Sequence, residues 1–225
     1  MGQYYAPLLF NADKPISAKS FIASVYCHDF GCGLKLTEHS YFGNVVVDTV
    51  IATISKLGKA RLVWAGDYAN KVKRMNLYNK FNDLNNIKEE AIPEKEYRYM
   101  VNHTKKECVN LDDYPRKYTT IKYEANGNTF YPVPCEGDML HPLPLLTCIG
   151  NGLGNGDYFP KYGCAETREY VGRWAGDVIS FSDDKPDDTY AEISPIFIDS
   201  QYDLATEMIA NARHNMSFIK KLPQR

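Results

Sequence analysis

Histidines in polar surroundings are the residues of this chain best suited to chemistry. Four of the five histidines follow this pattern, and they occur in the stretches His28-Asp29, Glu38-His39-Ser40, Asn102-His103-Thr104 and Asp138 to His141. A histidine beside a carboxylate can move protons near neutral pH without a metal. We therefore take as candidate acid–base residues Glu38, His39, His141 and Asp157.

A glycine-rich stretch over residues 150–157 is the second candidate feature. Glycine occupies every second position from Gly150 to Gly156, with asparagines and a leucine between. Glycine permits positive φ and close approach of the backbone to a ligand, and backbone amides suit anionic groups. Gly152 and Gly154 are therefore candidate ligand-binding residues. The same composition is typical of a plain surface turn, and the sequence leaves both interpretations open.

The glycine spacing matches no nucleotide-binding fingerprint. Asn155 stands where the third glycine of G-x-G-x-x-G would follow Gly152, and Pro142 and Pro144 interrupt the apolar run that would have to precede it. The lysine of a phosphate-binding P-loop is also missing. Dinucleotide-binding and ATPase functions are therefore not indicated.

Three more polar residues follow predicted strands, namely Asp67, His103 and Lys105. Strand ends can converge at one edge of a sheet, where binding residues are common. We include these three as candidate ligand-binding residues. Ser40 and Cys148 are candidate nucleophiles, although neither lies in a nucleophile-elbow sequence.

Cysteine and histidine spacing predicts no metal site. Cys27, His28, Cys32 and His39 are close in sequence, but their spacing matches no common zinc motif. No cofactor is identified from the sequence. The six cysteines are scattered and no secretory signal precedes them, which favours reduced thiols in the cytoplasm.

Composition limits the class of protein. The chain has 225 residues, 44% hydrophobic and 24% charged, which is ordinary for a globular domain. A net charge of −2 argues against general nucleic-acid binding, which depends on neutralising phosphates. No apolar run approaches the length needed to span a membrane. The sequence does not indicate an oligomeric state.

Hydrophobic periodicity predicts more strands than helices. A helix is expected between Asn44 as N-cap and Gly58 as C-terminal stop, and Asn126-Gly127 predicts a hairpin. The charged excursion near 70–96 is expected to be helical to about Asn86 and to break at Pro93. An amphipathic terminal helix is expected near 200–219. Strands are expected at residues 4–10 (an edge strand because of Pro7), 20–26, 59–65, 97–102, 171–175, 177–181 and 191–198.

These elements predict a single globular domain over residues 1–225. Its class is α+β, with a mostly antiparallel sheet and one or two packed helices. The sequence Trp-Ala-Gly-Asp occurs twice, beginning at Trp64 and at Trp174. The flanking residues do not extend this match, so we do not infer duplicated halves.

Several segments together resemble a group of uncharacterised bacterial and phage proteins that begin MGQYY. The segments are EHSYFGN, WAGDYA, VNHTKKE, HPLPLLT and GNGLGNGDY. They occur in the same order, and the resemblance spans most of the chain. The resemblance implies a single-domain bacterial or phage protein of the cytoplasm. It implies no catalytic residues and no activity.

Two functions follow from these observations. The first is binding or hydrolysis of a small molecule, for which a nucleotide-like ligand is the most concrete choice, at a pocket rich in His, Asp and Gly. The second is an accessory protein of a phage or mobile element that binds a host protein, in which case the glycine loop is only a surface turn. Convergence of the candidate side chains in one pocket would favour the first function.

Overall fold

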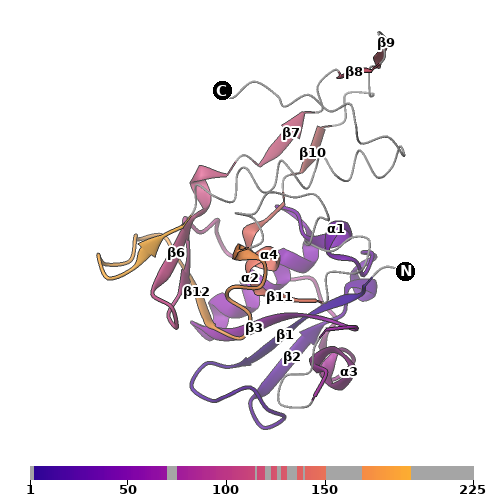
Figure 1. Ribbon diagram of the computed structural model, residues 1–225. Helices are drawn as coiled ribbons and strands as arrows, with labels where there is room; N and C mark the ends of the chain where they lie inside the picture. The colour runs from indigo at the N-terminus through magenta and orange to yellow at the C-terminus, as the bar shows by residue number, and fades with distance from the viewer. Residues whose placement is uncertain are drawn as a thin grey trace.

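The computed structural model describes residues 3–69, 75–114, 116–119, 123–125, 128–130, 136–138, 140–150 and 169–193. A nine-stranded mixed sheet in the order β13-β6-β5-β12-β3-β1-β2-β4, with β11 also paired to β3, forms its centre (Figure 1). The strands of this sheet are β1 (Tyr5–Asn11), β2 (Phe21–Val25), β3 (Ala60–Gly66), β4 (Asn86–Ile87), β5 (Tyr99–Asn102), β6 (Glu107–Asn110), β11 (Cys148–Ile149), β12 (Val178–Ser182) and β13 (Ala191–Glu192).

The sheet confirms the predicted α+β class. Its longer pairings are antiparallel, and each parallel pairing, β2 with β4, β3 with β11 and β6 with β13, joins two residues of each strand. Two further antiparallel pairs are β7 (Lys117–Thr119) with β10 (Glu136–Asp138), and β8 (Tyr123–Ala125) with β9 (Asn128–Phe130). The helices are α1 (Leu36–His39), α2 (Val45–Leu57), α3 (Leu77–Phe81) and α4 (Pro142–Thr147), with 3-10 helices η1 (Cys27–Phe30) and η2 (Leu111–Asp113).

Strand β1 is an inner strand, so the predicted edge position is wrong. β1 pairs with β3 over its whole length and with β2 over Leu8–Phe10. The amides of Tyr5 and Asn11 donate away from β3, to Leu34 and Ser20. In a strand, the backbone N–H groups of successive residues point to opposite edges. The nitrogen of Pro7 therefore points to the same edge as the amides of Tyr5 and Asn11, away from β3. Its missing N–H therefore interrupts no bond with β3.

Helix α2 begins and ends where the sequence predicts. The side chain of Asn44 accepts a hydrogen bond from the Val46 amide, and Gly58 ends the helix at φ 74°. Val46, Val50 and Ile54 of the predicted stripe are fully buried. The fourth member of that stripe, Leu57, is 45% exposed because it lies in the last turn, beyond the packed face.

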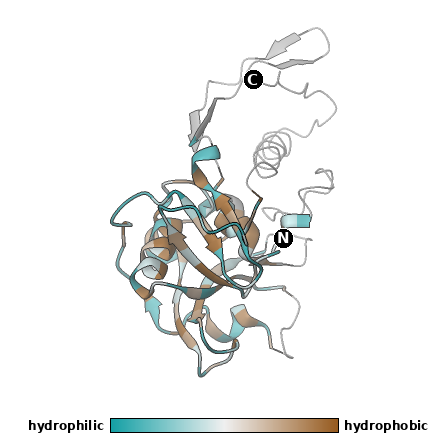
Figure 2. Cartoon of the chain, turned by 90° about the vertical axis from the view of Figure 1, so that its left-hand side faces the viewer, coloured by the Kyte–Doolittle hydropathy of each residue, from teal (hydrophilic) through white to brown (hydrophobic). Residues whose placement is uncertain are grey.

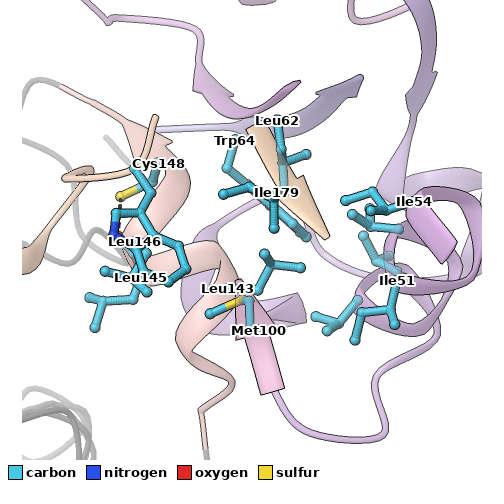
Figure 3. Packing of buried hydrophobic residues seen from close by; sticks show 14 of the residues in the cluster. Ile51, Ile54, Leu62, Trp64, Met100, Leu143, Leu145, Leu146, Cys148 and Ile179 are labelled. Carbon is cyan, nitrogen blue, oxygen red and sulfur yellow. Dashed lines mark hydrogen bonds between the residues drawn. The ribbon is translucent and has the colours of Figure 1, made fainter. Parts of the chain in front are cut away.

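The sheet is covered on both faces. Helices α2 and α4 pack on one face against Leu62, Trp64 and Ile179 (Figure 3). Helix α3 packs on the other face of β1 and β3 in a smaller cluster that contains Phe10 and Val63. In Figure 2 the hydrophobic segments lie in the helices and strands of this body, and hydrophilic segments occupy many of its loops. The apolar side chains buried in this way hold the layers together.

Helix α4 forms over a stretch for which no helix was predicted, since Pro142 and Pro144 interrupt its apolar run. Pro142 and Pro144 lie in its first turn, where backbone amides have no acceptor within the helix. Proline, which lacks an amide N–H, therefore costs no hydrogen bond there. His141 is the N-cap and accepts from the Leu143 amide at 3.0 Å. The prolines therefore begin this helix instead of preventing it.

Residues 171–175 form turns, not the predicted strand. Within this segment the amides of Gly172 and Trp174 donate to the carbonyls of Leu145 and Leu146, at 2.9 and 2.7 Å. These carbonyls lie at the C-terminal end of α4, where a helix cannot satisfy its own acceptors. The segment therefore caps the C-terminal end of α4, and β12 is the strand that follows it in the sheet.

The remaining predictions have mixed outcomes. The strands expected at 20–26, 59–65, 97–102 and 177–181 are confirmed as β2, β3, β5 and β12, whereas β6 was not predicted. β8 and β9 pair as the predicted hairpin requires, although its turn, like the terminal helix near 200–219, lies outside the described residues. The four described cysteines, Cys27, Cys32, Cys108 and Cys148, are free. Among the helices of the described segments, none combines the length and apolar character that crossing a membrane requires.

The N-cap of α2 provides a test of the fold. Asn44→Ala should lower the free energy of unfolding by about 0.5–2 kcal/mol, because the Val46 amide loses its acceptor. Asn44→Asp keeps a capping oxygen and should retain most of the stability. Urea denaturation of the three proteins checks this, and an alanine variant as stable as wild type would contradict the assigned cap.

Candidate functional site

His39 is part of the hydrophobic core. Its Nδ1 lies 2.9 Å from the Gly33 carbonyl, and its Nε2 accepts from Trp64 Nε1 at 2.9 Å. This pattern requires the neutral ring with its proton on Nδ1. Burial lowers the pKa of His39 to about 4, against the opposing effect of the Gly33 bond. Both nitrogens are engaged in the fold, so neither is available to a ligand.

Glu38 also makes local structural contacts. Its carboxylate accepts from the Lys35 amide at 3.0 Å and lies 3.5 Å from the Lys35 ammonium. The side chain passes so close to Gly33 that a Cβ there would clash with Oε2 of Glu38. Glu38 therefore stabilises the first turn of α1, while the neighbouring His39 side chain contacts Trp64.

His103 lies on the surface of the sheet, with different partners. Its Nε2 is 2.7 Å from Ser180 Oγ and its Nδ1 is 3.1 Å from the Tyr190 hydroxyl. Burial, followed by Lys59 and Lys106, lowers the pKa of His103. This network ties β5 to β12 and to the loop before β13.

Asp67 and Lys105 contact separate neighbours. Asp67 Oδ1 accepts from the Tyr4 amide at 3.0 Å, which fixes the N-terminal segment to the end of β3. Lys105 Nζ lies 3.7 Å from the Asp177 carboxylate. Asp177 also accepts from the buried Asn102 side chain at 2.8 Å. Both candidates thus fasten strand ends.

The candidate nucleophiles are buried within the body. Ser40 is fully buried, and its hydroxyl has no hydrogen-bond partner among the described residues. The Cys148 thiol donates to the Leu145 carbonyl at 3.3 Å. Neither lines the cavity described below.

His141 differs from the other three described histidines because it lines a cavity. Its Nδ1 is occupied by the Leu143 amide, and burial, followed by the charge of Arg116, lowers its pKa to about 3. The ring is therefore neutral at pH 7 and carries its proton on Nε2. Within the described residues Nε2 has no hydrogen-bond partner. His141 therefore has an N–H group to offer a ligand.

The cavity beside His141 has a volume of about 530 Å³. It lies between α2, the segment before β5, β12 and the region after β6. Two backbone contacts hold His141 at this cavity. Leu140 forms an antiparallel bridge with Tyr41, and the His141 amide donates to the Ser40 carbonyl at 2.7 Å. The lining residues are Phe42, Gly43, Asp48, Ile51, Ile92, Pro93, Lys95, Glu96, Tyr97, Leu111, Arg116, His141 and Phe181.

The charged groups of the cavity are two acids and two bases. Burial, followed by the charge of Glu96, raises the pKa of Asp48. The Arg116 guanidinium lies 4.2 Å from the centre of the Phe42 ring and 3.8 Å from Glu96. Lys95 forms an ion pair with Asp183 and lies 5.5 Å from the Tyr97 ring centre. The site thus combines aromatic walls with charges of both signs.

Of the candidate residues within the described segments, His141 alone lines this cavity. The hydrogen bonds above place His39 in the core and His103 on the sheet surface, so the three histidines do not share one pocket. Gly152, Gly154 and Asp157 lie outside the described residues. Sequence reasoning missed Arg116, Tyr97 and Phe181, which come from segments without a motif, and only their contacts reveal them.

A buried carboxylate at Glu107 was also missed. It accepts from Trp174 Nε1 at 2.6 Å and from Arg173 Nε at 3.1 Å. Although burial opposes ionisation, the Arg173 and Trp174 hydrogen bonds leave the pKa of Glu107 lowered. Glu107 does not line the cavity, so we assign it to stability.

Comparisons with protein-family models, with curated proteins and with solved structures found no match to this chain. Within the described segments, no three His, Cys, Asp or Glu side chains are grouped so that they could hold a metal ion.

The two buried histidines predict loss of stability in mild acid. Folding lowers the pKa of His39 to about 4 and that of His141 to about 3, from the ordinary 6.5. Between the lowered and the ordinary pKa, the unfolded chain therefore binds more protons than the folded chain. The free energy of unfolding should therefore fall as pH falls from 6.5, by up to about 1.4 kcal/mol per pH unit for each histidine. Urea denaturation between about pH 6.5 and 5 tests this, since most carboxylates remain ionised there.

His141→Asn is the matched control for this pH dependence. Asparagine retains an N-cap acceptor for the Leu143 amide but does not titrate. The variant should release about one proton less than wild type on refolding in this range. A wild-type stability that is constant over the range would contradict the neutral, buried state of both rings.

The Glu107 cluster predicts a second stability effect. Arg173→Met should cost about 2–3 kcal/mol, because Glu107 keeps a buried charge without its cation while Arg173 is itself part-exposed. Arg98→Met removes an exposed pair with Asp112 and should cost less than about 1 kcal/mol. Chemical denaturation distinguishes the two, and equal effects would show that the Glu107 pair contributes no more than a surface pair.

Proposed function

We propose that this chain binds a small molecule with a flat apolar ring in the cavity beside His141. The observation that carries the proposal is the combination of aromatic walls with the buried His141 ring, whose N–H has no hydrogen-bond partner among the described residues. The cavity volume of about 530 Å³ falls within the range typical of small-molecule sites. Such sites have mostly apolar linings with a few polar groups that orient the ligand.

The aromatic walls come from three separate segments. Phe42 precedes α2, Tyr97 precedes β5 and Phe181 belongs to β12. The Tyr97 and Phe181 ring centres are 5.8 Å apart with a tilt of 42°. Aromatic rings prefer offset or tilted contacts at such separations, so a planar ligand can add to this arrangement.

An exposed apolar side chain borders the same cavity. Ile92 is 81% exposed, although isoleucine is among the residues most often buried. A bound ligand would cover part of this surface and gain from its removal from water. Ile92 therefore supports binding at this position.

Binding fits the site better than hydrolysis does. A general base is most effective when its pKa is close to the working pH. The pKa of His141 is lowered to about 3, so at pH 7 the ring is a poor proton acceptor. We assign to His141 the role of a hydrogen-bond donor that orients the ligand.

A second proposal is that the chain is an accessory protein of a phage or mobile element that binds a host protein. The exposed Ile92 supports this alternative as well, because apolar surface is also covered at protein interfaces. Ligand screening separates the two proposals, since the second requires no small molecule.

Thermal-shift screening with planar aromatic compounds tests the proposed function. A ligand that binds only the folded chain raises the melting temperature. Tyr97→Ala should weaken binding about tenfold through loss of ring contact. Tyr68→Ala is the control, since Tyr68 is 53% exposed and does not line the cavity. No stabilising compound, or equal affinity in both variants, would contradict the proposal.

A further inference from the structure

The guanidinium of Arg116 is oriented at the cavity without a strong partner. It lies against the Phe42 ring, and its nearest described carboxylate is Glu96, at 3.8 Å. The Glu96 side chain is 92% exposed, so solvent screens this pair. Within the described residues Arg116 makes no hydrogen bond. Its planar fork of donors is therefore available to a ligand.

His141 provides a second donor in the lining of the same cavity. Arg116 and His141 both line the cavity, and the Phe42 ring contacts both, with its centre 4.4 Å from that of the imidazole. Arg116 is also close enough for its charge to lower the pKa of His141, after the larger effect of burial. An oxygen-rich group placed there would accept from both side chains.

Charge sets the kind of group that fits. Lys95 is already paired with Asp183, so Arg116 is the base of the described lining that remains for a ligand. Asp48, whose carboxylate is partly buried, lines the same cavity and would repel a group with two negative charges more strongly than a group with one. A phosphate monoester carries nearly two charges at neutral pH. A carboxylate carries one, and it matches the guanidinium fork in two parallel hydrogen bonds.

We infer that the ligand is an aromatic monocarboxylate whose carboxylate binds Arg116 and the Nε2–H of His141 while its ring contacts Phe42, Tyr97 and Phe181. This inference rests on the proposed function, because it specifies the ligand class of the same cavity. It differs from the nucleotide-like ligand expected from the glycine-rich loop, since the charge of the lining disfavours a dianion.

Three probes of one shape test the inference: naphthoate, naphthamide and naphthyl phosphate. Titration calorimetry with the full chain should find naphthoate about tenfold or more tighter than naphthamide, because a charged hydrogen bond is lost in the amide. Naphthyl phosphate should bind more weakly than naphthoate at neutral pH.

Substitution of Arg116 provides the matched comparison. In Arg116→Gln the preference for the acid over the amide should disappear, while naphthamide affinity stays within about twofold. Arg98→Gln is the control, since Arg98 pairs with Asp112 and does not line the cavity. Arg116→Lys keeps the charge without the fork, so it should retain part of the preference. Melting curves of the free variants establish that each is folded.

The outcomes separate this inference from the proposed function. If naphthoate and naphthamide bind with equal affinity, the proposed carboxylate recognition is wrong, whereas the proposed binding of an aromatic ring in the cavity is retained. If naphthyl phosphate binds tightest, or if Arg116→Gln keeps the preference, the assigned charge recognition is overturned. If none of the three probes binds and no aromatic compound raises the melting temperature, both proposals fail together.

Discussion

The complete enclosure of strand β3 is the constraint on which the rest of the structure depends. β3 pairs with β1 along one edge and with β12 and β11 along the other, and its two faces contribute to two hydrophobic clusters. All residues of β3 except Arg61 are buried, and a polar group in such a position needs a hydrogen-bond partner. The indole N–H of Trp64 is such a group, and His39 satisfies it. His39, a candidate acid–base residue in the sequence, is thus required by the core.

The second tryptophan presents the same physical problem, with a different solution. Trp174 is fully buried in a turn, and its indole donates to Glu107, which Arg173 neutralises. The same turn satisfies the carbonyls that end α4, and α4 presents His141 at its other end. The repeated Trp-Ala-Gly-Asp sequence therefore marks two buried indoles in unlike surroundings, a strand and a turn. Nothing in these contacts relates the two segments as copies.

The cavity follows from the way α4 and α2 are fastened to each other. The bridge between Tyr41 and Leu140 brings the segment before α2 beside the segment before α4. Phe42 and His141 are then adjacent, with ring centres 4.4 Å apart. The remaining walls come from Tyr97 and Phe181, which the sheet order places near α2 although they are distant in sequence. Within the described lining, the donors of Arg116 and of His141 Nε2 are not used by helix capping or by core hydrogen bonds, so these two groups carry the proposals.

The sequence by itself determined the elements whose signals are local. Asn44 and Gly58 mark the two ends of α2, because a capping side chain and a positive-φ glycine act on neighbouring amides. Strand periodicity identified β2, β3, β5 and β12. Tertiary structure decided the rest. Pro142 and Pro144 begin a helix whose far end a distant turn caps, and His39 and His141 differ in their available nitrogens because of residues remote in the chain. Such contacts between distant segments leave no periodic pattern in sequence, so which polar residue lies in the core and which faces a cavity was settled only by packing.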